Sequence, residues 1–443
     1  MKLTLRQRLL TAFTLFGMFF GAGNLIFPVH LGQLSGSSAI PAMIGFCITA
    51  VGIPILGVAA IGFTHSDGLL SLAGKVSKGY GYFFTCLLYL TIGPFFAIPR
   101  LASTSFTTGI SPVINSSEQP WLLLYSGIFF AAVLFFSLKP GKITVWIGKI
   151  INPLFLAFLA VLVLAALINP PASISAITPA PEYSSGAFFE SFIEGYGTMD
   201  AIAGLAFGIV VINIIKEMGV EKDETIAGEV LKSGILAGAL MVIVYVVTIL
   251  MGAQSRGAFA LSDNGGIALS QIAYYCFGDF GTYMLAGIII SACLKTAIGL
   301  VTSIGTAFNR MFPRVSYKMW AIIFTCLSFA ISNVGLSAII SYSTPVLMFI
   351  YPLGITLIAT AFIGKFFKHD RCIYISVTAF TTAAAIFDFL KALPSGIINA
   401  LHLEGIISLA GKILPFYELG LGWVIPALLG LAIGIVIHFS RCP

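Results

Sequence analysis

The chain has 443 residues, of which 58% are hydrophobic and only 9% are charged, and its mean hydropathy is +1.02. A water-soluble globular chain of this length would not have this composition, so the sequence predicts a membrane protein with many spans. The net charge of +6 arises from loops on one side of these spans and gives no reason to expect a nucleic-acid partner.

Windows of about 20 apolar residues mark candidate transmembrane helices. The N-terminus resembles a signal peptide, but no cleavage site of small residues follows, so we expect a retained first span. The sequence thus predicts an all-α fold of about twelve transmembrane helices. They cover approximately residues 9–33, 39–63, 81–109, 120–138, 143–168, 188–215, 231–253, 280–308, 318–333, 336–366, 372–393 and 420–439.

Lysine and arginine gather in alternate loops, which predicts that these loops and both termini are cytoplasmic in the cell membrane. Two further stretches do not read as spans. Residues 257–278 are expected to form a short helix over the outer mouth, and the amphipathic residues 395–414 to rest in the outer interface. The alternative is that both stretches only connect neighbouring spans. The cysteines and histidines show no metal-ligand spacing, so no cofactor is expected.

The first span contains "FFGAGNLIFP", residues 19–28, where a helix should run unbroken. Glycine costs about 1 kcal/mol relative to alanine in a helix interior, and asparagine competes for backbone hydrogen bonds. The glycines would serve either as close helix contacts or as a break in the helix. The G-x-G spacing of Gly21 and Gly23 places them on different helix faces, which favours a break.

The sixth predicted span contains a similar interruption, "EGYGTMDAIAGLAFGIV", residues 194–210. An offset of five spans reverses the direction through the membrane. This predicts inverted repeats in residues 1–168 and 188–366, followed by two additional segments in 372–443. Unwound backbone at the midplane would offer N–H groups to an anion and carbonyl groups to a cation, as an amino acid requires. Thr198 or Asp200 would also serve to cap the second half-helix.

The segments "LFGMFFGAGNLIFP", "LTIGPFFAIPR" and "EGYGTMDAIAGLAFGIVVIN" resemble the signatures of the branched-chain amino acid:cation symporter family, in the amino acid–polyamine–organocation superfamily. The resemblance implies uptake of leucine, isoleucine and valine driven by sodium or protons, on the five-plus-five inverted-repeat fold of the leucine transporter. No obligate protein partner is evident. An alternative is a sodium-independent, proton-coupled or exchange carrier of other small apolar amino acids.

The resemblance also implies roles for residues in both breaks. The substrate carboxylate would lie against the first break, and the second would give carbonyls to the ammonium group and walls to the side chain. Asn24 and Thr198 would share a sodium ion beside the carboxylate. The residues implied are Phe20, Gly21, Ala22, Gly23 and Asn24 in the first break, and Tyr196, Gly197, Thr198 and Met199 in the second.

Arg100 lies deep in the third span, and an ionisable residue at that depth is a functional hypothesis by default. Glu194 and Asp200 are its candidate partners. Either a fixed ion pair holds the helices together, or Arg100 faces the outer vestibule as a gate.

Lys295, in "SACLKTAIGLVTS", residues 291–303, lies near the middle of the eighth span. In sodium-coupled members of the fold, a small–x–x–hydroxyl–hydroxyl pattern here binds an ion with carbonyls of the first span. The matching register is Ala292, Lys295 and Thr296. Lys295 is expected either to meet carbonyls such as those of Gly17 and Phe20 or to lose its charge. We hypothesise that it replaces the ion; a shifted site at Thr302 and Ser303, or a structural tether, is the alternative.

Two other classes of membrane protein lack support. An ion channel would need a filter segment or a ring of acidic side chains, and an intramembrane hydrolase would need a catalytic constellation. Neither pattern is visible in the sequence, so we expect a carrier and not an enzyme.

Overall fold

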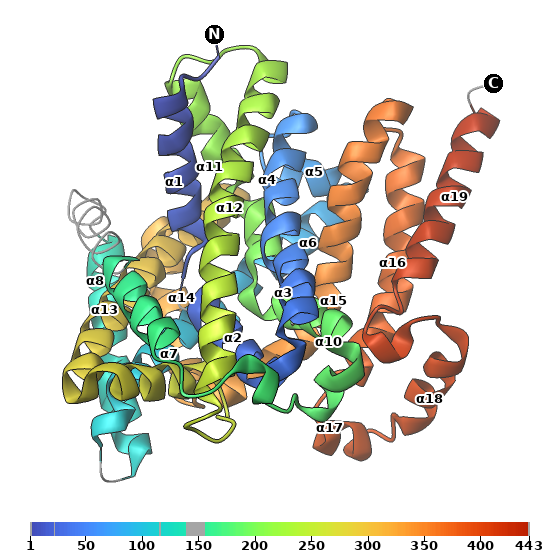
Figure 1. Cartoon of the computed structure of the whole chain (residues 1–443). Helices are drawn as coiled ribbons and strands as arrows, with labels where there is room; N and C mark the ends of the chain where they lie inside the picture. Colours follow the sequence, from blue (N-terminus) through green and yellow to red (C-terminus); the bar gives the residue numbers. More distant parts are fainter. Residues whose placement is uncertain (1, 22, 115–116, 139–155, 442–443) are drawn as a thin grey trace.

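The computed structural model describes residues 2–21, 23–114, 117–138 and 156–441. These residues form helices and contain no strand, which confirms the predicted all-α fold. Figure 1 shows most helices running between the top and the bottom of the molecule, with the start of α1 and the end of α19 both at the top. The main helices are α1 Leu5–Phe19, α2 Gly23–Ser35, α3 Ala39–Cys47, α4 Ile53–Phe63, α5 Leu69–Gly74, α6 Lys78–Leu90, α7 Ala97–Gly109, α8 Glu118–Leu138, α10 Pro181–Glu194, α11 Asp200–Glu217, α12 Asp223–Ser255, α13 Gly265–Met311, α14 Tyr317–Ser332, α15 Leu336–Ile363, α16 Arg371–Lys391, α17 Ser395–Ala400, α18 Glu404–Ile413 and α19 Val424–Arg441.

The helices occupy all twelve predicted positions within the described residues. Seven helical stretches are long and apolar enough to cross a membrane, and the bent pair α10 and α11 makes an eighth. One stretch, Gly23–Phe63, has 41 residues, more than one span needs, and it covers the end of the first predicted span and the whole second. Shorter apolar helices fill the remaining positions at Leu156–Ile168, Tyr317–Ser332 and Val424–Ser440. The first part of the fifth predicted span lies outside the described residues.

Helix α2 is held very close to α12 by glycines on both helices. A Cβ added at Gly32 would lie 2.1 Å from the carbonyl oxygen of Ile249, and one added at Gly252 would lie 2.0 Å from that of Val29. Any larger residue would push the helices apart, as at other small-residue contacts between membrane helices. This contact fixes α2, the second half of the first span, against the span that carries Tyr245.

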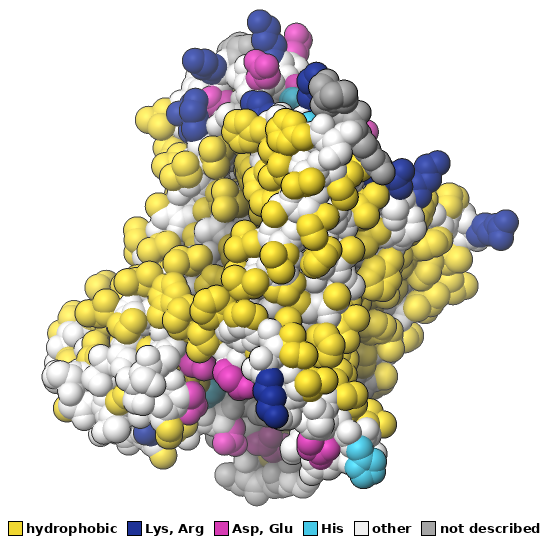
Figure 2. All heavy atoms as spheres, turned by 90° about the vertical axis from the view of Figure 1, so that its right-hand side faces the viewer, with side chains coloured by type: hydrophobic (Ala, Val, Ile, Leu, Met, Phe, Trp, Pro, Cys, Tyr) yellow, Lys and Arg dark blue, Asp and Glu magenta, His cyan; other side chains and the backbone are white. Residues whose placement is uncertain are grey.

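The two stretches predicted to lie outside the membrane are helical. Gly278 has a φ of 59°, which separates the first part of α13 from its spanning part. Residues 395–414 form two short helices, α17 and α18, because the chain turns at His402, which has a φ of 52°. These helices lie at the bottom of the molecule in Figure 1, opposite to the start of α1 and the end of α19. Figure 2 shows that most lysine and arginine side chains on the visible face lie toward the upper end.

Candidate functional site

The first span breaks between Phe19 and Gly23, as the sequence predicts. Phe20 has extended backbone angles, φ −73° and ψ 97°, so α1 ends there. The N–H of Gly21 donates a hydrogen bond to Oδ1 of Asn24, 2.9 Å away, and this bond closes the turn into α2. The Asn24 side chain therefore satisfies a backbone group that the break leaves without a helical partner. Ala22, a predicted site residue, lies outside the described residues.

The sixth span breaks at the 3-10 turn Gly195–Thr198 and bends by 46° there. Met199 follows with a φ of 64°, a left-handed conformation that is uncommon for a residue other than glycine. The hydroxyl of Thr198 accepts a hydrogen bond from the N–H of Asp200, at 3.3 Å, and donates one to the carbonyl of Gly195, at 3.0 Å. Thr198, which precedes the N-cap residue Met199, thus satisfies the first N–H of α11. Asp200 stands in the first turn of α11, where the helix dipole favours a carboxylate.

Side chains from three spans meet between the two breaks. The amide nitrogen of Asn24 donates hydrogen bonds to Oδ2 of Asp200 and to the hydroxyl of Tyr245. The Tyr245 hydroxyl in turn donates to Oδ2 of Asp200 at 3.0 Å. All three residues are buried. This network links the two broken helices to α12 and holds the carboxylate in one position.

Tyr245 was not predicted from the sequence. The sequence feature that could have pointed to it is a phenol in the mainly apolar run "VIVYVVTIL" of the seventh span. A buried tyrosine usually finds a hydrogen-bond partner, so a partner within the membrane was to be expected.

Arg100 contacts the unwound segment of the sixth span and not a carboxylate. Its Nη1 donates a hydrogen bond to the carbonyl of Gly197 at 2.6 Å, and its guanidinium carbon lies 5.1 Å from the centre of the Phe27 ring. In the described part of the chain, no ion pair within 4.0 Å involves Arg100. A direct ion pair with Glu194 or Asp200 is therefore not formed, although Arg100 and Asp200 interact electrostatically. The reason is that unwinding frees the Gly197 carbonyl, which becomes the nearest acceptor.

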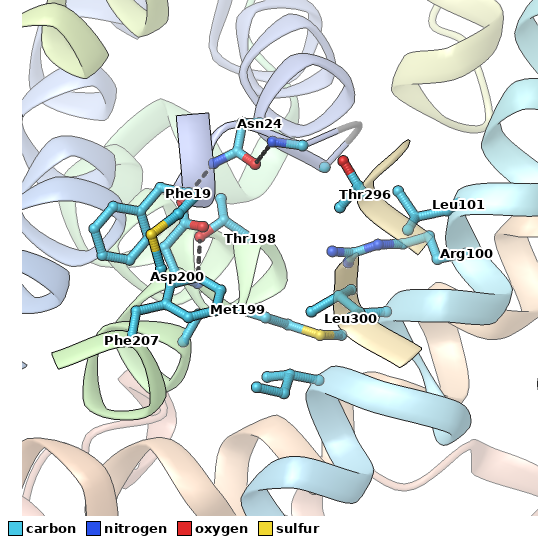
Figure 3. A pocket seen from close by; sticks show the side chains of 16 residues that line it. Phe19, Asn24, Arg100, Leu101, Thr198, Met199, Asp200, Phe207, Thr296 and Leu300 are labelled. Atoms are coloured by element: carbon cyan, nitrogen blue, oxygen red, sulfur yellow. Dashed lines mark hydrogen bonds between the residues drawn. The ribbon is translucent and has the colours of Figure 1, made fainter. Parts of the chain in front are cut away.

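A small cavity, partly open to its surroundings, lies between the broken helices, α7 and α13. Asp200 and Arg100 both line it, from α11 and α7. Figure 3 shows the Arg100 side chain extending toward the cavity from the side opposite Asp200, Thr198 and Asn24. The rest of the wall is mainly apolar, from Met18, Phe19, Ile92, Ala97, Leu101, Met199, Ala203, Phe207 and Leu300.

The predicted site residues divide into those that line the cavity and those that do not. The lining includes Gly21, Gly23, Asn24, Arg100, Thr198, Met199, Asp200 and Thr296. It does not include Gly17, Phe20, Tyr196, Gly197, Ala292 and Lys295.

Several predicted residues outside the lining have other contacts. Tyr196 stacks on Tyr351, with ring centres 4.1 Å apart. Phe20 stacks on Phe16, with centres 4.9 Å apart. Ala292 accepts a hydrogen bond from the Thr296 hydroxyl at 3.0 Å. Gly197 acts on the cavity indirectly, because its carbonyl holds Arg100.

At the predicted sodium position, the side-chain oxygens of Asn24 and Thr198 already take part in hydrogen bonds within the protein. Oδ1 of Asn24 accepts from Gly21, and the Thr198 hydroxyl bonds to Gly195 and Asp200. The described residues contain no group of three or more His, Cys, Asp or Glu that could hold a metal ion. The Asp200 carboxylate is thus the anionic group nearest to this position, and sodium binding here stays a hypothesis.

Comparison with known proteins places this geometry in a family. The family model described as branched-chain amino acid transport protein matches residues 4–441. The branched-chain amino acid permease BrnQ of Lactobacillus delbrueckii subsp. lactis is 50% identical over 435 residues, covering 98% of this chain and 97% of that protein. The permease BrnQ of Bacillus subtilis strain 168 is 38% identical over 428 residues, covering 96% of each.

Solved structures resemble this one in fold. The inward-facing conformation of Mhp1 matches with a TM-score of 0.63 at 13% identity, covering 98% of this chain and 91% of that one. MhsT in complex with L-phenylalanine matches with a TM-score of 0.54 at 17% identity, covering 99% of both. Both have the leucine-transporter fold, which confirms the predicted fold type. The chain is a multi-pass transporter and not an enzyme, and it belongs to the family of branched-chain amino acid transport proteins.

Proposed function

We propose that this protein imports leucine, isoleucine and valine by alternating access, coupled to a cation gradient. The observation that carries the proposal is one cavity with a carboxylate, a guanidinium and otherwise mainly apolar walls. The names of the permease relatives support the same substrates.

The two charged groups match the two ends of an amino acid. The substrate ammonium group would pair with Asp200, which Asn24 and Tyr245 hold in place. The substrate carboxylate would pair with Arg100, whose planar fork suits carboxylates. A branched aliphatic side chain would then lie against the apolar walls.

The same cavity disfavours amino acids with charged side chains. Among the described lining residues, Arg100 and Asp200 are the charged ones, and both are committed to the ends of the substrate. A third charge would be buried without a partner, which costs several kcal/mol. Other small apolar amino acids stay an alternative, because nothing in an apolar wall selects one branched side chain strictly.

The proposed orientation places the start of α1 and the end of α19 in the cytoplasm. Lysine and arginine concentrate in the loops at that end, as the positive-inside rule requires. The first part of α13 and the helices α17 and α18 then lie at the outer face. Import would proceed from that face toward the termini.

The coupling ion is proposed to be a proton, with the Lys295 ammonium group in the place of a sodium ion. The support is the register of Ala292, Lys295 and Thr296, together with the place of Thr296 in the cavity wall beside the first break. A Cβ added at Gly21 would lie 3.8 Å from Cγ2 of Thr296, so α13 faces the unwound segment at this level.

Leucine uptake into proteoliposomes under separately imposed sodium and pH gradients tests this proposal. The wild type is expected to accumulate leucine under a pH gradient without sodium, and strict sodium dependence would contradict the proposal. In Lys295→Thr, loss of the pH response would assign the proton to the lysine itself. A retained pH response would make Lys295 a fixed charge and leave the proton to another group. Lys318→Thr, at an exposed lysine, is the matched control.

A further inference from the structure

Another buried carboxylate lies outside the cavity, on α16. Asp388 is 0% exposed, and neither of its oxygens makes a hydrogen bond of ordinary geometry in the described structure. It also forms no ion pair within 4.0 Å there. Burying an ionised carboxylate without a partner is very costly, so this group needs a ligand that neutralises it.

The nearest cation is already engaged by other groups. Lys391, one turn further along α16, bonds to the Glu418 carboxylate at 2.9 Å and to the carbonyls of Tyr417 and Glu418. The Asp388 carboxylate instead lies against backbone, because a Cβ added at Gly422 would be 3.1 Å from its Oδ1. The N–H groups of Gly422 and Trp423 also face it, beyond ordinary hydrogen-bond geometry.

Asp388 is connected to the unwound segment of the sixth span through Tyr196. The two groups interact electrostatically, and the Tyr196 hydroxyl is likewise buried without a hydrogen bond of ordinary geometry. The residue after Tyr196 is Gly197, whose carbonyl holds Arg100. Asp388 is thus joined to the cavity by a series of contacts, through Tyr196 and then the Gly197 carbonyl that holds Arg100.

The other titratable groups around Asp388 come from every neighbouring element. Tyr417 faces it from the turn Tyr417–Leu419, and Lys391 from α16 itself. Glu418 interacts with Tyr417 and Lys391. On α15, Tyr351 stacks on Tyr196, and on α10, Glu190 interacts with Lys391. In the described side chains of α19, His438 is the titratable group, and it bonds to Asp370 near the start of α16, far from Asp388.

We propose that Asp388 is a proton-binding site that links the two additional C-terminal spans to the unwound segment. A proton from water converts the carboxylate to a neutral acid, which has no desolvated charge and gains an O–H donor. A metal ion is disfavoured, because the N–H groups that face the carboxylate would repel it and the described residues contain no group of three or more His, Cys, Asp or Glu that could hold one. The proposal deepens proton-coupled transport and rests on that proposed function.

The test compares Asp388→Asn with Glu404→Gln, an acid-to-amide control at an exposed residue of α18. Asparagine mimics the neutral acid but cannot release a proton. We expect Asp388→Asn to lose pH-driven leucine accumulation at least tenfold while leucine exchange across equal concentrations persists. Glu404→Gln should keep both. Retention of pH-driven accumulation in Asp388→Asn would overturn the proposal.

Infrared spectroscopy of the purified protein gives a readout that does not need transport. With ¹³C-labelled aspartate, the wild type should show the carbonyl band of a buried protonated acid, and Asp388→Asn should lack it. Absence of such a band in the wild type would overturn the proposal even where the variant does not fold. A wild type that shows the band but transports no leucine would refute the proposed function and leave the proton site standing.

Discussion

Replacing Asp200 by asparagine is expected to weaken leucine binding by at least about a hundredfold, because an ammonium group buried without its counter-charge costs about 3–5 kcal/mol. Asparagine has nearly the same shape, and the bonds from Asn24 and Tyr245 to one side-chain oxygen remain geometrically possible. The loss of leucine affinity in this variant therefore measures the contribution of the negative charge and not a change in packing. Calorimetric titration of the purified protein with leucine measures it, with size-exclusion profiles to confirm folding.

Tyr245→Phe is the matched control for this prediction. It removes one hydrogen bond to Asp200 and keeps the carboxylate, so the expected cost is about 1 kcal/mol, or a loss of roughly fivefold. Equal affinity of the wild type and Asp200→Asn for leucine would contradict the assignment of Asp200 to the ammonium group.

Gly23→Ala is expected to lower leucine uptake by about fivefold or more, given that overpacking costs about 1–3 kcal/mol. A Cβ at this position would lie 2.8 Å from Nη2 of Arg100. The guanidinium would have to shift, and the proposed carboxylate site would move with it. Initial rates of labelled leucine uptake, normalised to the amount of protein in the membrane, measure the effect.

Gly21→Ala, two residues earlier in the same motif, is the control. A Cβ there would meet nothing closer than 3.7 Å, which is ordinary van der Waals contact. Uptake should fall by less than about threefold, within the range of modest helix-propensity effects. An equal loss in both variants would show that the motif matters through backbone flexibility and not through the position of Arg100.

The breaks in the first and sixth spans could be predicted because their cause is local. Gly21, Gly23 and Asn24 oppose a helix wherever they stand together in an apolar run. The hydrogen bonds of the Thr198 hydroxyl are local as well, since they join residues within three positions along the chain. The hydropathy of the spans is similarly a property of each segment by itself.

The partners of the site residues could not be predicted, because they come from distant parts of the chain. Tyr245 reaches Asp200 only after α12 packs on α2. From sequence alone, a single tyrosine in an apolar segment is equally compatible with a residue at the membrane–water interface. For Arg100 the expected partner was a charged side chain, but a backbone carbonyl freed by unwinding satisfies it. Asp388 also lies in a span whose sequence gives no sign of its buried neighbours.

The most direct test of the central claim is competition against labelled leucine uptake by analogues that lack one end of the amino acid. The claim is that Asp200 binds the ammonium group of the substrate, Arg100 binds its carboxylate, and the apolar walls bind its side chain. Excess valine and isoleucine should block uptake. Leucinamide, which lacks the carboxylate, 4-methylpentanoate, which lacks the ammonium group, and lysine and glutamate, which add a charge, should leave uptake nearly unchanged. Competition by leucinamide or glutamate as strong as that by valine would contradict the account.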